Sequence, residues 1–150
     1  MLTGSLALAS VHLCLACLLV LPSQSKLCSK DVFSTVHILL QSDPNSTCSG
    51  CRLYTPSIED YKQRCPRSTM MCFANESKVL IEEWDDYRGP RLDRKLGKLA
   101  QWLKQPESEC RQCEFQKEET AGKFLADLLK TLQMMNSQHC TRPFRSPERK

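Results

Sequence analysis

The stretches CPRSTMMC (residues 65–72) and CRQC (residues 110–113) determine how this chain folds. Their cysteines are spaced i, i+7 and i, i+3, so each pair lies on one face if the segment is helical. Two such pairs can be joined by two roughly parallel disulfide bonds, Cys65–Cys110 and Cys72–Cys113. Each bond would close a loop of about 40 residues and stabilise the fold by roughly 3–4 kcal/mol in the chain-entropy model. The spacing therefore predicts a small, disulfide-stapled domain.

The first 25 residues indicate that the chain is exported. An apolar run over residues 6–21 is followed by Ser-Gln-Ser at 23–25, and small residues in this arrangement are typical of a signal-peptide cleavage site. Cleavage after Ser25 removes Cys14 and Cys17 and leaves eight of the ten cysteines. An even number of cysteines in a small exported chain indicates a disulfide framework. We therefore expect a signal peptide over 1–25 and a secreted, extracellular protein.

The rest of the chain is predicted to hold one domain, over residues 26–140, and a basic flexible tail, over 141–150. The tail contains two prolines and four basic residues, which is typical of a solvated segment. The net charge of +4 is too small to indicate nucleic-acid binding. No segment after residue 25 is long and apolar enough to predict membrane insertion, so we expect the mature chain to be soluble. We also expect it to be a monomer.

Apolar periodicity predicts four helices, over residues 30–42, 67–87, 90–103 and 113–137. The clearest stripe is that of the third helix, with leucines at 92, 96, 99 and 103. Residues 52–56 are predicted to be extended, and Ser57 with Asp60 resembles a capping box before an early turn over 57–63. Four amphipathic helices bury their stripes most simply against one another. The sequence thus predicts an all-α four-helix bundle.

Enzymatic and metal-binding functions find little support in the sequence. Only two histidines follow residue 25, and no nucleophile-elbow, H-E-x-x-H or phosphate-loop motif occurs. The C-x-x-C motifs at 48–51 and 110–113 could supply four thiolates to zinc, but they are far more widely separated than in a zinc ribbon. Export also favours disulfides over zinc. We therefore expect no catalytic residues, no metal and no cofactor.

Five short stretches carry a resemblance to a known family. They are LYTP (53–56), CPRSTMMCF (65–73), ECRQCE (109–114), KFL (123–125) and LQMM (132–135). Together they resemble interleukin-15 and the interleukin-15-like cytokines of fish, with interleukin-2 the next nearest relative. The resemblance covers the second half of the first loop, the start of the second helix and nearly all of the fourth. The first and third helices match only in pattern.

The resemblance implies a short-chain cytokine bundle with up-up-down-down topology. It also implies pairing of the first cysteine of C-x6-C with the first of C-x2-C, and of the second with the second. Such a cytokine binds a small α receptor and signals through a β chain and a common-γ chain, promoting the proliferation and activation of T and NK lymphocytes. An interleukin-2-type cytokine of the same fold is the alternative within the family.

The resemblance also assigns contacts residue by residue. The common-γ contacts are Gln133 and Met134, and the β-chain contact is Asp31, which is offset by one position from the matching aspartate of the family. The α-receptor contacts are Tyr54, Glu76, Val79 and Glu83.

The sequence contains two N-glycosylation sequons, at Asn45 and Asn75. Asn45 is expected in a loop, where it would be a good acceptor. Asn75 adjoins the expected α-receptor contacts, and a glycan there would obstruct binding. Either Asn75 is unmodified or that face is misassigned.

A saposin-like lipid-binding module is the alternative from another class, because it is also helical and rich in disulfides. Its bonds would nest, with Cys65 joined to Cys72, and it would need a broad exposed apolar face. Four further cysteines allow three pairings, and the sequence does not choose among them. They are Cys28, Cys48, Cys51 and Cys140.

Overall fold

The computed structural model describes residues 25–105 and 109–141. Nearly all of the expected signal peptide (1–25) and basic tail (141–150) therefore lies outside the described residues. Lys26–Cys140 is one compact unit. Among the described residues, no helix is both long enough and apolar enough to span a membrane.

The first helix, α2 (Lys30–Gln41), forms where the apolar spacing predicts it, with Val32, Val36 and Leu39 buried on one side. It ends before Asp43, whose φ of 51° lies in the left-handed region. A short helix, α3 (Pro44–Thr47), follows, where the sequence predicted a loop. Pro44 stands at the first position of α3, where its missing N–H is tolerated.

The segment before the second long helix contains a strand and a capped turn of helix. β1 (Leu53–Thr55) is extended, as predicted. α4 (Ile58–Gln63) begins with the expected capping box, in which the Asp60 N–H donates to Ser57 Oγ and the Ser57 N–H donates to the Asp60 carboxylate. The early turn is therefore confirmed as a helix of its own.

The two central helices are shorter than predicted. α5 (Pro66–Glu83) starts at a proline and ends four residues earlier than residue 87. It ends there because Trp84 is extended and buried, and Asp86 is left-handed, with φ of 53°. α6 (Leu92–Trp102) buries three leucines of the predicted stripe, and Pro90 precedes the helix instead of lying in its first turn.

The prediction of one helix over 113–137 is wrong in its first part. That part consists of a 3-10 turn, η1 (Cys113–Phe115), and a strand, β2 (Lys117–Glu119). β2 pairs antiparallel with β1, with Tyr54 opposite Glu118. α7 (Ala121–His139) begins only after Thr120, whose hydroxyl accepts the Lys123 N–H at 3.3 Å. Cys110 and Cys113 therefore do not share a helix face.

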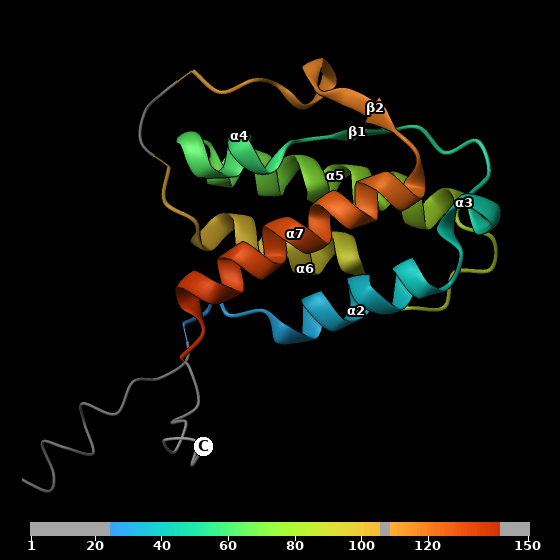
Figure 1. Cartoon of the computed structure of the whole chain (residues 1–150), viewed down its shortest axis with the longest axis horizontal. Helices are drawn as coiled ribbons and strands as arrows, with labels where there is room; N and C mark the ends of the chain where they lie inside the picture. The colour runs from blue at the N-terminus through green and yellow to red at the C-terminus, as the bar shows by residue number, and fades with distance from the viewer. Residues whose placement is uncertain (1–24, 106–108, 142–150) are drawn as a thin grey trace, which may run out of the picture. The chain divides into compact units, whose positions relative to one another are not determined.

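The helices pack in pairs around one core, and the short sheet lies beside them (Figure 1). α2 packs mainly on α7, and α5 mainly on α6. β1 runs along α5 at the upper edge of Figure 1, and β2 pairs with β1. Phe73 of α5 and Phe124 of α7 are fully buried, with ring centroids 5.5 Å apart. The fold is thus mostly helical, with a two-stranded sheet that the sequence did not predict.

Four disulfide bonds hold these elements together. Cys65–Cys110 and Cys72–Cys113, the two bonds that the spacing allows, tie α5 to the segment before β2. Cys28–Cys140 joins the residues before α2 to the end of α7, and Cys48–Cys51 closes the turn after α3. The nested saposin-like pairing, with Cys65 bonded to Cys72, is therefore wrong. All four cysteines of the two C-x-x-C motifs are in disulfides, so none is a free thiolate for zinc.

Candidate functional site

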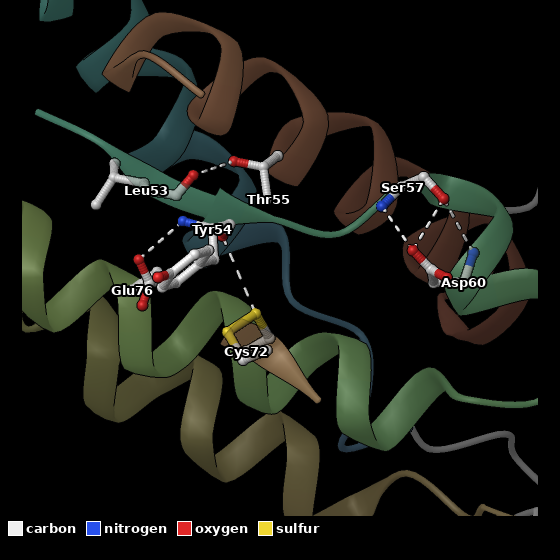
Figure 2. The surroundings of a disulfide bond; sticks show 8 residues. Leu53, Tyr54, Thr55, Ser57, Asp60, Cys72 and Glu76 are labelled. Atoms are coloured by element: carbon white, nitrogen blue, oxygen red, sulfur yellow. Dashed lines mark hydrogen bonds between the residues drawn. A yellow bond between two sulfur atoms is a disulfide. The ribbon is translucent and has the colours of Figure 1, made fainter. Parts of the chain in front are cut away.

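Tyr54 and Glu76 meet where β1 runs along α5 (Figure 2). β1 buries Leu53 and Thr55, and alternation along the strand leaves Tyr54 between them only half-buried. The Tyr54 N–H donates to the Glu76 carboxylate at 2.9 Å. Cys72, one turn earlier on α5, lies 4.0 Å from the Tyr54 carbonyl oxygen and is bonded to Cys113. The strand is therefore held on α5 by a hydrogen bond, next to the disulfide that ties α5 to η1.

Three carboxylates form an acidic group around this contact: Glu76, Glu83 and Glu118. Partial burial raises the pKa of Glu76, and repulsion from Glu118 and Glu83 raises it further, against the lowering effect of the Tyr54 N–H. Glu118 reaches the group because β2 places it opposite Tyr54. Sequence reasoning missed Glu118 because it placed residues 113–120 in a helix. The cap residue Thr120 was the signal that α7 starts later.

The other two expected α-receptor contacts lie further along α5. Val79 is half-buried and packs against the core, so only part of its side chain faces solvent. Glu83 is exposed at the end of α5. Its carboxylate lies within 4.8 Å of the sulfurs of Cys48 and Cys51, but these sulfurs are bonded to each other. We therefore treat Glu83 as part of the acidic group and not as a metal ligand.

Asp31, the expected β-chain contact, is at the start of α2 and pairs with Lys95 of α6 at 3.1 Å. Slight burial acts to raise the pKa of Asp31, but hydrogen bonds from Lys95 and from the Val32 N–H outweigh it and lower the pKa. The Asp31 side chain is 69% exposed, so this ion pair contributes at most about 1 kcal/mol and can exchange partners. Any partner of Asp31 must therefore compete with Lys95.

Gln133 and Met134, the expected common-γ contacts, lie in the second half of α7. Gln133 is exposed, whereas its neighbours Leu132 and Met135 are fully buried. Met134 is half-buried and packs against the core, so it offers a partner less of its side chain than Gln133 does. This surface belongs to a different helix from the acidic group.

The two sequon asparagines have different surroundings. Asn45 lies in α3, not in the expected loop, and its side-chain oxygen accepts the Gly122 N–H at 2.9 Å in the first turn of α7. A Cβ at residue 122 would lie 3.0 Å from both terminal atoms of the Asn45 amide, so glycine permits this contact. Asn75 is exposed and lines a hollow of about 370 Å³ between α5 and the CRQC segment.

No protein-family model, curated protein or solved structure matches this chain.

Removing the charge of Glu76 tests the acidic group without breaking its hydrogen bond. In Glu76→Gln the amide oxygen still accepts the Tyr54 N–H. Because the pKa of Glu76 is raised on folding, the folded wild type binds more protons than the unfolded chain above about pH 4, so this carboxyl costs stability as the pH rises. The stability of the variant relative to wild type should therefore increase between about pH 4 and pH 7. Urea unfolding across this range measures it, and a pH-independent difference would contradict the raised pKa.

Proposed function

We propose that this protein is a secreted cytokine of the interleukin-2 and interleukin-15 family. It binds a small α receptor through the acidic group and Tyr54, a β chain through the α2 surface around Asp31, and a common-γ chain through Gln133. The observation that carries the proposal is the contact between Tyr54 and Glu76. The resemblance assigns both to one receptor surface although they are 22 residues apart in sequence, and their direct hydrogen bond makes a single surface possible.

The connections between helices support an up-up-down-down cytokine bundle. α5 and α6 are joined by residues 84–91 only, and short connections join antiparallel neighbours. The connections from α2 to α5 and from α6 to α7 are much longer, as the two crossovers of a cytokine bundle require. One crossover contributes β1 and the other β2, and these strands pair with each other.

The charges support a cationic partner for the acidic group. Glu118 and Glu83 repel the Glu76 carboxylate and raise its pKa, and a basic surface that approaches the group would relieve this repulsion. Opposite charges on two partners speed their encounter and make it salt-dependent. An α receptor with a basic binding surface therefore fits the acidic group, and its binding should weaken as the salt concentration rises.

The test is receptor binding and signalling by residues 26–150, produced with the four disulfides intact. We expect the protein to bind the α-receptor ectodomain in surface plasmon resonance. We also expect STAT phosphorylation in lymphocytes that carry the β and common-γ chains, and none in matched cells that lack common γ. Binding to no receptor chain, together with binding to lipid vesicles, would overturn the proposal in favour of a lipid-binding helical protein.

A further inference from the structure

Phe115 is the most exposed large apolar side chain in residues 25–105 and 109–141, at 71%. Two others are exposed, Ile38 at 60% and Trp102 at 49%. The Trp102 ring is partly covered, because Lys26 Nζ lies 3.8 Å from its centroid. A single exposed apolar residue needs no explanation by itself. The surroundings of Phe115 set it apart from the other two.

The backbone that carries Phe115 is held on both sides. Cys113 before it is bonded to Cys72 of α5, and β2 after it is paired with β1. Within η1 the Phe115 N–H donates to the Gln112 carbonyl at 3.0 Å. An aromatic side chain has only two torsions, so on a fixed backbone it loses little conformational entropy when it is bound. Phe115 is thus preorganised to insert into a partner.

Phe115 also stands next to the acidic group. η1 contacts both β1 and α5, the two elements that carry Tyr54 and Glu76. Glu118 follows on β2, opposite Tyr54. The one basic residue of β2, Lys117, is paired with Glu119 at 3.2 Å, so the strand contributes net negative charge. The exposed Phe115 is therefore carried by a segment that packs on the two elements holding Tyr54 and Glu76 and that leads directly into the strand with Glu118.

We infer that Phe115 is the apolar anchor of the α-receptor surface, filling an apolar recess that basic residues of the receptor surround. This inference rests on the proposed function and adds a residue that the resemblance does not assign. Buried aromatic anchors ringed by polar contacts commonly dominate the energy of an interface. In this interface Phe115 would be the central anchor, and the acidic group would make the polar contacts around it.

The negative charge of this surface favours the α receptor over two other possible partners, a second copy of the chain and a membrane. A second copy of the chain, docked through the same surface, would place acidic group against acidic group. An anionic membrane would repel the same carboxylates, and one aromatic side chain does not make the broad apolar face that lipid binding needs. A protein surface with a basic rim fits both the charge and the aromatic side chain.

The test replaces Phe115 and compares it with a matched exposed residue. We expect Phe115→Ser to weaken binding to the α-receptor ectodomain at least about tenfold, mainly through faster dissociation, while helical circular dichroism and the melting temperature stay unchanged. Ile38→Ser, on α2, should bind like wild type. Phe115→Tyr should retain most of the affinity.

Three outcomes would overturn the inference. If wild type binds and Phe115→Ser binds equally well, Phe115 is not an anchor, and the proposed function survives. If Phe115→Ser loses affinity for phosphatidylserine vesicles but not for the receptor, the occupant is a membrane. If wild type itself does not bind the α receptor, the proposed function fails, and this inference fails with it.

Discussion

Replacing Cys28 and Cys140 together by alanine should lower the free energy of unfolding by about 4–5 kcal/mol. This disulfide spans 112 residues of sequence, the largest separation among the four bonds of the described chain. In the chain-entropy model, stabilisation grows with the logarithm of loop length, so this bond constrains the unfolded chain most. For a domain of this size, we expect a fall in melting temperature of about 15–20 °C.

The contacts next to this disulfide indicate that its loss would also loosen the fold locally. Ser29 is only 2% exposed, and its N–H and hydroxyl donate to the Asn136 side-chain oxygen at 2.9 and 3.0 Å. These hydrogen bonds join the start of α2 to the end of α7, beside the Cys28–Cys140 bond. Without the disulfide, these hydrogen bonds and the packing of α2 on α7 remain to hold the two ends together. Hydrogen exchange should therefore speed up first at the start of α2.

The matched control is Cys48→Ala with Cys51→Ala, which removes a disulfide that closes a loop of only four residues. The same model gives about 2 kcal/mol for that loop. Thermal and urea unfolding of both double variants measure the difference. If the two variants lose equal stability, loop length does not govern the contribution of these bonds. The Cys28–Cys140 bond would then not be the one that constrains the unfolded chain most.

The parts of the fold that the sequence predicted well are those with one clear apolar stripe. α2 and α6 were placed to within about two residues, because Val32, Val36 and Leu39, and likewise Leu92, Leu96 and Leu99, repeat at helical spacing and are buried. The later part of α7 follows the same rule. In these segments the residues that the apolar pattern marks are the ones that the fold buries, so the pattern alone is enough to place the helix.

The segment before α7 could not be predicted from pattern, because tertiary contacts override its propensity. Residues 114–119 contain three glutamates, a glutamine and a lysine, all good helix formers. The disulfide at Cys113 and the pairing of β2 with β1 hold this segment as a 3-10 turn followed by a strand instead. Neither the strand pairing nor its register is visible in the sequence. The two-stranded sheet was missed for this reason.

The contacts of the candidate site depend on such long-range placement. The bond from the Tyr54 N–H to Glu76 spans 22 residues, and the Asp31–Lys95 pair spans 64. Sequence named Tyr54, Glu76 and Asp31 through the resemblance, but it could not show that Glu76 also holds a strand. That second role makes Glu76→Lys a poor test of receptor binding, since lysine would leave the Tyr54 N–H without its acceptor.

Changing Gln133 to aspartate should abolish signalling and leave the fold intact. Gln133 is exposed on α7, between buried Leu132 and half-buried Met134, so the substitution touches no core contact. On an exposed helix surface it should cost only a few tenths of a kcal/mol. If the common-γ chain buries this amide, a carboxylate there lacks a partner and costs about 2–5 kcal/mol of binding, which is roughly a 30- to 4,000-fold loss of affinity.

The measurement is STAT phosphorylation in responsive lymphocytes over a dose series, with circular dichroism and α-receptor binding measured on the same preparation. Gln138→Asp is the matched control, because Gln138 is also exposed on α7 but is rotated by about 140° around the helix axis. It makes the same chemical change nearer the helix C-terminus, where a negative charge is less favourable, so it should cost at least as much stability. Loss of signalling by Gln133→Asp alone would therefore report a contact and not a weakened helix. Wild-type signalling by both variants would remove Gln133 from the common-γ surface and leave that assignment resting on resemblance.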